Sequence, residues 1–243
     1  MLRKLLLAAL MIVACFGAAS GQRLTGQIVE VDVGGRTVKL IVAEGQCVLD
    51  GTEQADRSIL DVVTRALAGQ NELLLHTAEC ANLAEVRRGA TAYLDNFAQA
   101  QVLIQLKTRD FRGEEGRVVE QVCRYLRTLG EELQKKVGPD IERRIADLAL
   151  GIGVNEQRQL GVLDQDEHGC YTGTLMGLST PSGETRLLLG VYAVTVLNGR
   201  IVYLYRFQAQ PQEGEQRRLL AVVKAAVKDH ISANSEETKP AGR

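Results

Sequence analysis

The densest group of potential metal ligands is the segment Asp164-Gln165-Asp166-Glu167-His168-Gly169-Cys170. In an EF-hand-like calcium loop, alternate side chains converge on one ion. The segment matches positions one, three, five and six of such a loop with Asp164, Asp166, His168 and Gly169. The twelfth position should hold a bidentate glutamate, and it holds Leu175. Strand-like sequence flanks the segment, so it also fits a hairpin turn in which Gly169 supplies an unusual backbone angle. The sequence favours the turn over a metal site.

The three histidines offer little acid–base chemistry. Cys80 follows His76 by four residues, and a cysteine nucleophile needs a base within hydrogen-bonding reach. Residues four apart in one strand are about 13 Å apart, too far for such a pair. We expect His76 to be a strand residue with a local hydrogen bond and His230 to be a solvated helix residue. His168 and Cys170 could share a soft metal, but two ligands without a distant pair do not make a zinc site.

Motifs of the common enzyme classes are missing from the chain. It has no Gly-x-Ser-x-Gly, no phosphate-binding glycine loop and no His-Glu-x-x-His. Gly151-Ile152-Gly153 follows a predicted helix and lacks the third glycine of a dinucleotide-binding turn. Four basic pairs could contact anionic lipid, but each has acidic residues nearby, so we expect them on solvated helix faces. They are Arg87-Arg88, Lys135-Lys136, Arg143-Arg144 and Arg217-Arg218. The sequence predicts no catalytic, cofactor-binding or metal-binding residue.

The N-terminal residues have the pattern of an export signal. Arg3 and Lys4 precede the apolar run 5–16, and small residues follow over 17–21. The run has about 12 residues, fewer than the roughly 20 that span a bilayer as a helix. This pattern predicts a cleaved secretory signal peptide over 1–21 and a periplasmic or secreted protein. An alternative is Ile12-Val13-Ala14-Cys15, which resembles a bacterial lipobox and would anchor a lipoprotein through Cys15; Cys15 can also be simply one more apolar residue of the signal.

Four cysteines follow the signal: Cys47, Cys80, Cys123 and Cys170. In an oxidising compartment an even number indicates disulfide bonds, and four cysteines allow three pairings. The wide spacings, with no Cys-x-x-Cys, disfavour a zinc site or a redox-active dithiol.

The first half of the chain predicts a hairpin, helices and strands. Alternating apolar residues with Gly34-Gly35 between them predict a β-hairpin over 24–43. A helix is expected over 56–68, with Asp56 or Ser58 capping its start and Gly69 ending it. Strands are expected around 73–75 and 102–104, and a strongly amphipathic helix over 114–137. A second short helix should begin at Pro139.

The second half predicts an antiparallel meander with strands at 160–163, 171–178, 186–197 and 201–205. Asn198-Gly199 is a strong hairpin signal between the last two. A final helix carries the apolar residues 219–231, and the polar residues 235–243 are expected to be disordered. The fold class is therefore α+β, an antiparallel sheet flanked by helices in a single domain over 22–234.

The charge balance and the low aromatic content bear on which kinds of partner the protein could bind. The 29 Lys and Arg nearly cancel the 30 Asp and Glu, and no long run of either sign occurs. A nucleic-acid binder would show a basic patch, so nucleic acid is not an expected partner. The chain has no tryptophan, which argues mildly against stacking surfaces and implies an aliphatic core.

Several segments resemble a family of exported proteobacterial proteins of unknown function. They are Gln46 to Asp50, Asn71 to Cys80 with Leu83, Arg87 and Gly89, Leu160 to Leu163, and the hairpin at Asn198-Gly199 with its closing helix. The layout is also similar to the Mog1/PsbP-like fold. The family resemblance implies a Cys47–Cys80 disulfide and leaves Cys123–Cys170 as the remaining pair. Neither resemblance brings a known activity.

Two functions of different classes remain open. The first is a non-enzymatic periplasmic accessory or interaction protein with an unidentified protein partner, no cofactor, and no stable membrane insertion unless Cys15 is lipidated. The second is a small-molecule or metal-dependent enzyme whose polar residues, such as Asp50, His76, Asp95, Asp164 and His168, converge only in the fold.

Overall fold

The computed structural model describes residues 26–128, 153–179 and 185–235, with the side chains of 153–156 and 179 excepted. The predicted signal peptide, Cys15 and the helix expected at Pro139 lie outside these ranges. So do the second part of the helix predicted over 114–137 and the tail beyond residue 235.

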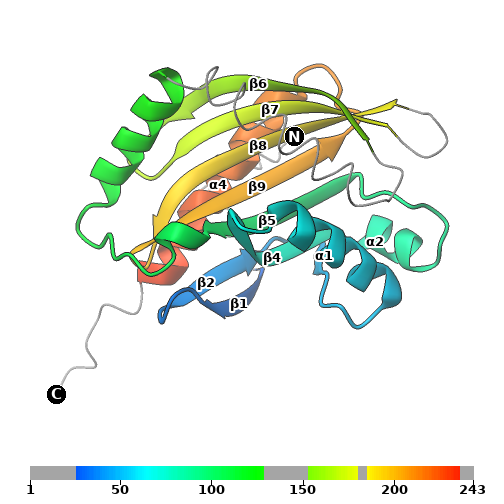
Figure 1. Ribbon diagram of the computed structural model, residues 1–243, viewed down its shortest axis with the longest axis horizontal. Coiled ribbons are helices and arrows are strands. Elements are labelled where there is room, and N and C mark those ends of the chain that lie inside the picture. Colours follow the sequence, from blue (N-terminus) through cyan, green and yellow to red (C-terminus); the bar gives the residue numbers. More distant parts are fainter. Residues whose placement is uncertain (1–25, 129–152, 180–184, 236–243) are drawn as a thin grey trace, which may run out of the picture.

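A seven-stranded antiparallel sheet forms the centre of the molecule, in the order β3-β4-β5-β9-β8-β7-β6 (Figure 1). The strands are β3 (Gln46–Val48), β4 (Asn71–Glu79), β5 (Asn96–Leu103), β6 (Gly153–Gln165), β7 (Cys170–Ser179), β8 (Thr185–Leu197) and β9 (Arg200–Ala209). The helices within the described ranges are α1 (Gln54–Leu67), α2 (Cys80–Arg87), the helix over 115–128 and α4 (Glu215–Ser235), with a 3₁₀ turn at Ile104–Leu106. The predicted α+β class is confirmed.

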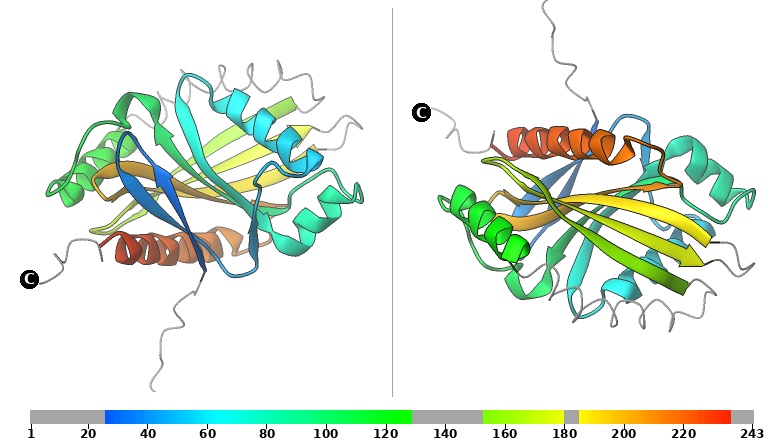
Figure 2. Two further views of the ribbon diagram at one scale, coloured as in Figure 1. Left: turned by 90° about the horizontal axis from the view of Figure 1, so that it is seen from below. Right: turned by 90° about the horizontal axis from the view of Figure 1, so that it is seen from above.

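One face of the sheet is covered by two elements that lie side by side. The hairpin of β1 (Gln27–Asp32) and β2 (Thr37–Val42) forms its own two-stranded sheet, and its alternating Val33, Val38 and Leu40 are buried as the pattern predicted. Beside it runs α4, whose Leu219, Val223 and Val227 join these residues in the main apolar core (Figure 2). The predicted final helix is thus confirmed, and it continues to Ser235, the first residue of the predicted tail.

The opposite face carries the helix over 115–128 and α1 (Figure 2). Val118 packs with Val194, Val196 and Ile201 of β8 and β9, and Val119 packs beside the Cys123–Cys170 disulfide. None of the described helices is long and apolar enough to cross a membrane.

Three local predictions need correction. α1 begins after Glu53 without a side-chain cap, because Asp56, expected to cap it, is fully buried and binds Arg87 of α2 at 2.6 and 2.9 Å. Arg87 is therefore not part of a solvated helix face, and its pKa is raised by the Asp56 carboxylate. The strand expected at 102–104 ends at Leu103.

Both predicted disulfides are confirmed. Cys47 of β3 bonds Cys80, the first residue of α2, and Cys123 of the helix over 115–128 bonds Cys170 of β7. The two bonds span 33 and 47 residues, so each stabilises the fold by about 3 to 4 kcal/mol through the chain entropy of the unfolded state. Two disulfides are consistent with an oxidising, extracytoplasmic compartment.

Candidate functional site

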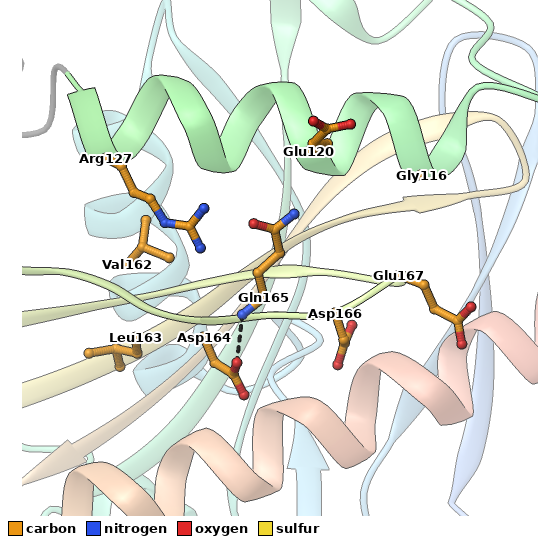
Figure 3. A pocket seen from close by; sticks show the side chains of 9 residues that line it. All are labelled: Gly116, Glu120, Arg127, Val162, Leu163, Asp164, Gln165, Asp166 and Glu167. Atoms are coloured by element: carbon orange, nitrogen blue, oxygen red, sulfur yellow. Dashed lines mark hydrogen bonds between the residues drawn. The ribbon is translucent and has the colours of Figure 1, made fainter.

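An open cleft of about 610 Å³ separates the helix over 115–128 from the end of β6 and the turn that follows it (Figure 3). Its lining residues are Gly116, Glu120, Arg127, Val162, Leu163, Asp164, Gln165, Asp166 and Glu167. The Cys123–Cys170 disulfide ties the helix to β7, the strand that pairs with β6, and so holds the two walls of the cleft together. The cleft therefore lies beside the polar segment that the sequence singled out.

The segment is a hairpin turn, as the sequence favoured. The Asp166 carboxylate accepts hydrogen bonds from the backbone N–H groups of His168 and Gly169, both at 3.0 Å, and from the Tyr171 hydroxyl. The expected backbone role of Gly169 is wrong, since Gly169 has no positive φ. A Cβ at this position would instead meet the Tyr171 ring at 2.9 Å, so the glycine makes room for that ring.

The two aspartates of the turn are held by α4. Lys224 Nζ lies 2.6 Å from Asp164 Oδ2 and 3.5 Å from Asp166 Oδ2, and both side chains point away from the helix over 115–128 (Figure 3). The ion pair lowers the pKa of Asp164 and raises the pKa of Lys224. The carboxylates that an EF-hand would need are therefore occupied by an ammonium group.

Two side chains face the cleft without a partner. Gln165 and Arg127 point into the space between β6 and the helix (Figure 3), and within the described ranges neither side chain forms a hydrogen bond or ion pair. Glu120 binds Arg124 at 2.6 Å, and Glu167 lies 3.3 Å from His168 Nε2. The cleft thus offers a free guanidinium and a free amide, without a nucleophile paired to a base.

The residues named for a possible enzyme site do not converge. Asp50 accepts hydrogen bonds from Thr52, and Asp95 lies 3.5 Å from Arg186. His76 is on β4 and Asp164 is on β6, with four strands between them in the sheet. Five strand spacings amount to about 24 Å. In the described part of the chain, moreover, no group of three or more potential ligands is placed to hold a metal ion.

The expected local hydrogen bond of His76 is wrong. The ring is 2% exposed, and neither nitrogen has a hydrogen-bond partner in the described structure. Its nearest aromatic neighbour is Phe97 of β5, with ring centroids 5.6 Å apart. Burial lowers the pKa of His76 to about 4, against a smaller opposing effect of Asp56. His76 is therefore a neutral, packed side chain near pH 7.

Sequence reasoning did not identify the aromatic row that continues from His76 across the sheet. Phe97 stacks on Phe207 at 4.7 Å, Phe207 lies 5.7 Å from Tyr205, and Tyr205 lies 4.8 Å from Tyr192. The alternation of Tyr203, Tyr205 and Phe207 along β9 was the local signal that these rings share a face. Burial raises the pKa of Tyr203 to about 12, so these phenols remain neutral and do not act as bases.

His230 is buried, in contrast to the solvated residue expected. It is 6% exposed; its Nε2 accepts a hydrogen bond from the backbone N–H of Ile41 at 3.0 Å, and its Nδ1 donates to the Ala226 carbonyl at 2.7 Å. Asn234, one turn later, bonds both the N–H and the C=O of Lys39. These two side chains complete the outer edge of β2.

No protein-family model and no curated protein matches this chain. The family resemblance of the sequence stays a prediction, and the function has to be argued from the cleft and from its surroundings.

Proposed function

We propose that this is an exported, non-catalytic accessory protein of the periplasm that binds an extended segment of a partner protein along β6. The observation that carries the proposal is the position of β6. Among the described strands it lies at the edge of the sheet with β7 as its one neighbour, and its end opens into the cleft. An edge strand presents N–H and C=O groups that pair readily with an added strand, and such pairing is a common mode of peptide recognition.

The side chains of the cleft supply the selectivity. The free Arg127 guanidinium favours a partner segment with an acidic residue at that end, because a guanidinium binds a carboxylate in two-point fashion. The free Gln165 amide can donate to and accept from a peptide group at once. Glu120 and Glu167 disfavour further acidic residues elsewhere in the segment. The preferred partner is therefore an extended polar peptide with one acidic residue.

Other features support a non-enzymatic role in an oxidising compartment. The two disulfides fit an exported protein. The separation of Asp50, His76, Asp95 and Asp164, most of them engaged elsewhere, argues against the alternative of an enzyme whose site assembles in the fold.

Site-specific photocrosslinking in the native host tests the proposal. A photoreactive phenylalanine analogue replaces Gln165 in the cleft or, as a control, Lys228 on the exposed side of α4. We expect a discrete crosslinked product from position 165 and not from position 228. Arg127→Glu should reduce that product several-fold, whereas the same reversal at the exposed Arg217 should leave it unchanged. Equal products from positions 165 and 228, or a product insensitive to Arg127→Glu, would contradict the proposed docking site.

A further inference from the structure

A second, smaller cavity lies on the other face of the sheet, between α4, the end of β2 and strands β4, β5 and β9. Its volume is about 90 Å³, and its wall is largely apolar. Alanines stand where these elements meet and leave the space unfilled: Ala43 after β2, Ala98 and Ala100 on β5, and Ala226 on α4. An unfilled cavity forfeits packing energy, so a site of this kind suits an apolar guest.

One charged residue lines the cavity. Arg206 of β9 is partly buried and, within the described ranges, forms no hydrogen bond and no ion pair. Its cross-strand neighbours are the small Ala98 and the apolar Val191, which cannot bind a guanidinium. A half-desolvated guanidinium without a counter-ion is costly, and a carboxylate would relieve that cost.

The charges around Arg206 also favour the binding of an anion. Burial and the neighbouring charge of Arg218 lower the pKa of Arg206, while Glu79 is the acid that opposes them. Arg218 is itself bound to Glu215. Two other titratable residues line the wall. His230 uses both ring nitrogens in backbone hydrogen bonds and so does not compete for the anion, and burial raises the pKa of the Tyr205 phenol, which stays neutral.

The volume of the cavity limits the size of the ligand. A cavity of about 150 Å³ holds benzene, so 90 Å³ suits a smaller hydrocarbon group of about three to five carbons. Val222 of α4, 37% exposed, belongs to the same wall and gives the cavity an apolar side open to solvent. A long acyl chain does not fit.

We propose that this cavity binds a short aliphatic carboxylate, with its hydrocarbon part among the alanines and its carboxylate on the Arg206 guanidinium. The proposal is independent of partner binding along β6, because the cleft and this cavity share no residue.

Calorimetric titration of the full exported protein tests the site with three probes. Isovalerate has the tail and the charge, isopentanol has the tail alone, and acetate has the charge with almost no tail. We expect saturable one-to-one binding of isovalerate and at least about tenfold weaker binding of the other two. Isopentanol lacks the carboxylate that would bond to the guanidinium, and acetate lacks the hydrocarbon that would fill the cavity.

Three variants locate the site. Arg206→Met keeps the length of the side chain and should weaken isovalerate binding about tenfold, to the level of isopentanol. Arg217→Met, the same change at an exposed position of α4, should have no effect. Ala226→Leu should fill the cavity and abolish binding of both isovalerate and isopentanol. Thermal unfolding of each variant shows whether it is folded.

Several outcomes would overturn the proposal. These are the absence of saturable isovalerate binding, equal affinity for isovalerate and acetate, and binding that Arg206→Met leaves unchanged in a folded protein. Binding of valine-terminated peptides without binding of free isovalerate would also overturn it, in favour of a peptide C-terminus as the ligand.

Discussion

Two buried histidines in different regions of this molecule differ in the hydrogen bonding of their ring nitrogens. His230 on α4 and His76 on β4 are 6% and 2% exposed. Both nitrogens of His230 are hydrogen-bonded, one to the edge of β2 and one to its own helix. Neither nitrogen of His76 has a partner in the described structure, and its ring packs beside Phe97.

The difference shows that burial alone does not tell what a polar residue contributes. Burial lowers the pKa of both rings, and for His230 the bond to the Ala226 carbonyl partly offsets that effect. His230 and Asn234 supply the hydrogen bonds that an edge strand otherwise lacks, so they join the small β1–β2 sheet to α4. His76 joins nothing through hydrogen bonds and acts as an apolar ring with a desolvation cost.

The largest effect is expected from His230→Leu. The substitution leaves the partly buried N–H of Ile41 without an acceptor and removes the bond to Ala226, which should lower the free energy of unfolding by about 3 kcal/mol. His76→Leu is the matched control, because it removes two nitrogens that have no partner; it should change stability by about 1 kcal/mol or less, or increase it. Urea midpoints at pH 7.5 measure both. Equal losses would mean that His76 has a bond absent from this structure.

The second largest effect is expected on the pH dependence of stability, through His76. The pKa of His76 is about 4 in the folded protein, against 6.5 in the unfolded chain, so the unfolded chain binds more protons between these values. The stability contributed by the neutral ring is complete above pH 6.5 and is lost as the pH falls toward 4, by about 3 kcal/mol in all. Urea unfolding from pH 7.5 to 4 should show this slope in the wild type and a smaller slope in His76→Leu. The residual slope belongs to His230, whose pKa is also lowered, and near pH 4 to Asp50, Asp110 and Asp164, whose pKa values are lowered by their hydrogen bonds. An unchanged slope in His76→Leu would remove His76 as its source.

Elements with a local pattern were predictable from the sequence. The period-two alternation of the β1–β2 hairpin and the Asn198-Gly199 turn, where φ is 45° and 77°, depend on neighbouring residues alone. α2 was not predicted, because its eight residues carry no apolar stripe and its first residue is tied by a disulfide to β3. Such a helix is determined by tertiary contacts.

Only part of the candidate site was predictable, for the same reason. The turn at Asp166 is a local structure, but Lys224, which binds its aspartates, is 60 residues from Asp164. His230 receives a hydrogen bond from a backbone N–H that is 189 residues away, and sequence does not tell which strand edge is left unpaired. A signal did exist: His230 follows Leu219, Val223 and Val227 at helical spacing and so belongs to the buried side of α4.

A smaller effect is expected at the end of α4. Asn234→Ala should lower stability by about 2 kcal/mol, since the side chain bonds both backbone groups of Lys39. Truncation after Asn234 removes Ser235 and the polar residues that follow, and it should change stability by less than about 0.5 kcal/mol. Thermal or urea unfolding of the two variants separates these effects. A truncation as costly as Asn234→Ala would place a structural role beyond Asn234.

The smallest effect extends the comparison from histidines to threonines, where a matched change is available. Thr195 is fully buried and its hydroxyl donates to the His168 carbonyl at 2.7 Å, whereas the hydroxyl of Thr174, equally inaccessible, has no partner in the described structure. Valine has nearly the same shape as threonine, so the substitution isolates the hydroxyl. Thr195→Val should cost about 1 kcal/mol, because it leaves a carbonyl of the β6–β7 turn without that donor. Thr174→Val should be neutral or slightly stabilising, since an unpaired hydroxyl is removed from an apolar setting. Urea midpoints resolve a difference of this size when the unfolding slopes agree. If Thr174→Val proves the more costly of the two, the Thr174 hydroxyl forms a hydrogen bond absent from this structure, and the contrast between buried polar groups with and without partners is weaker than the histidines indicate.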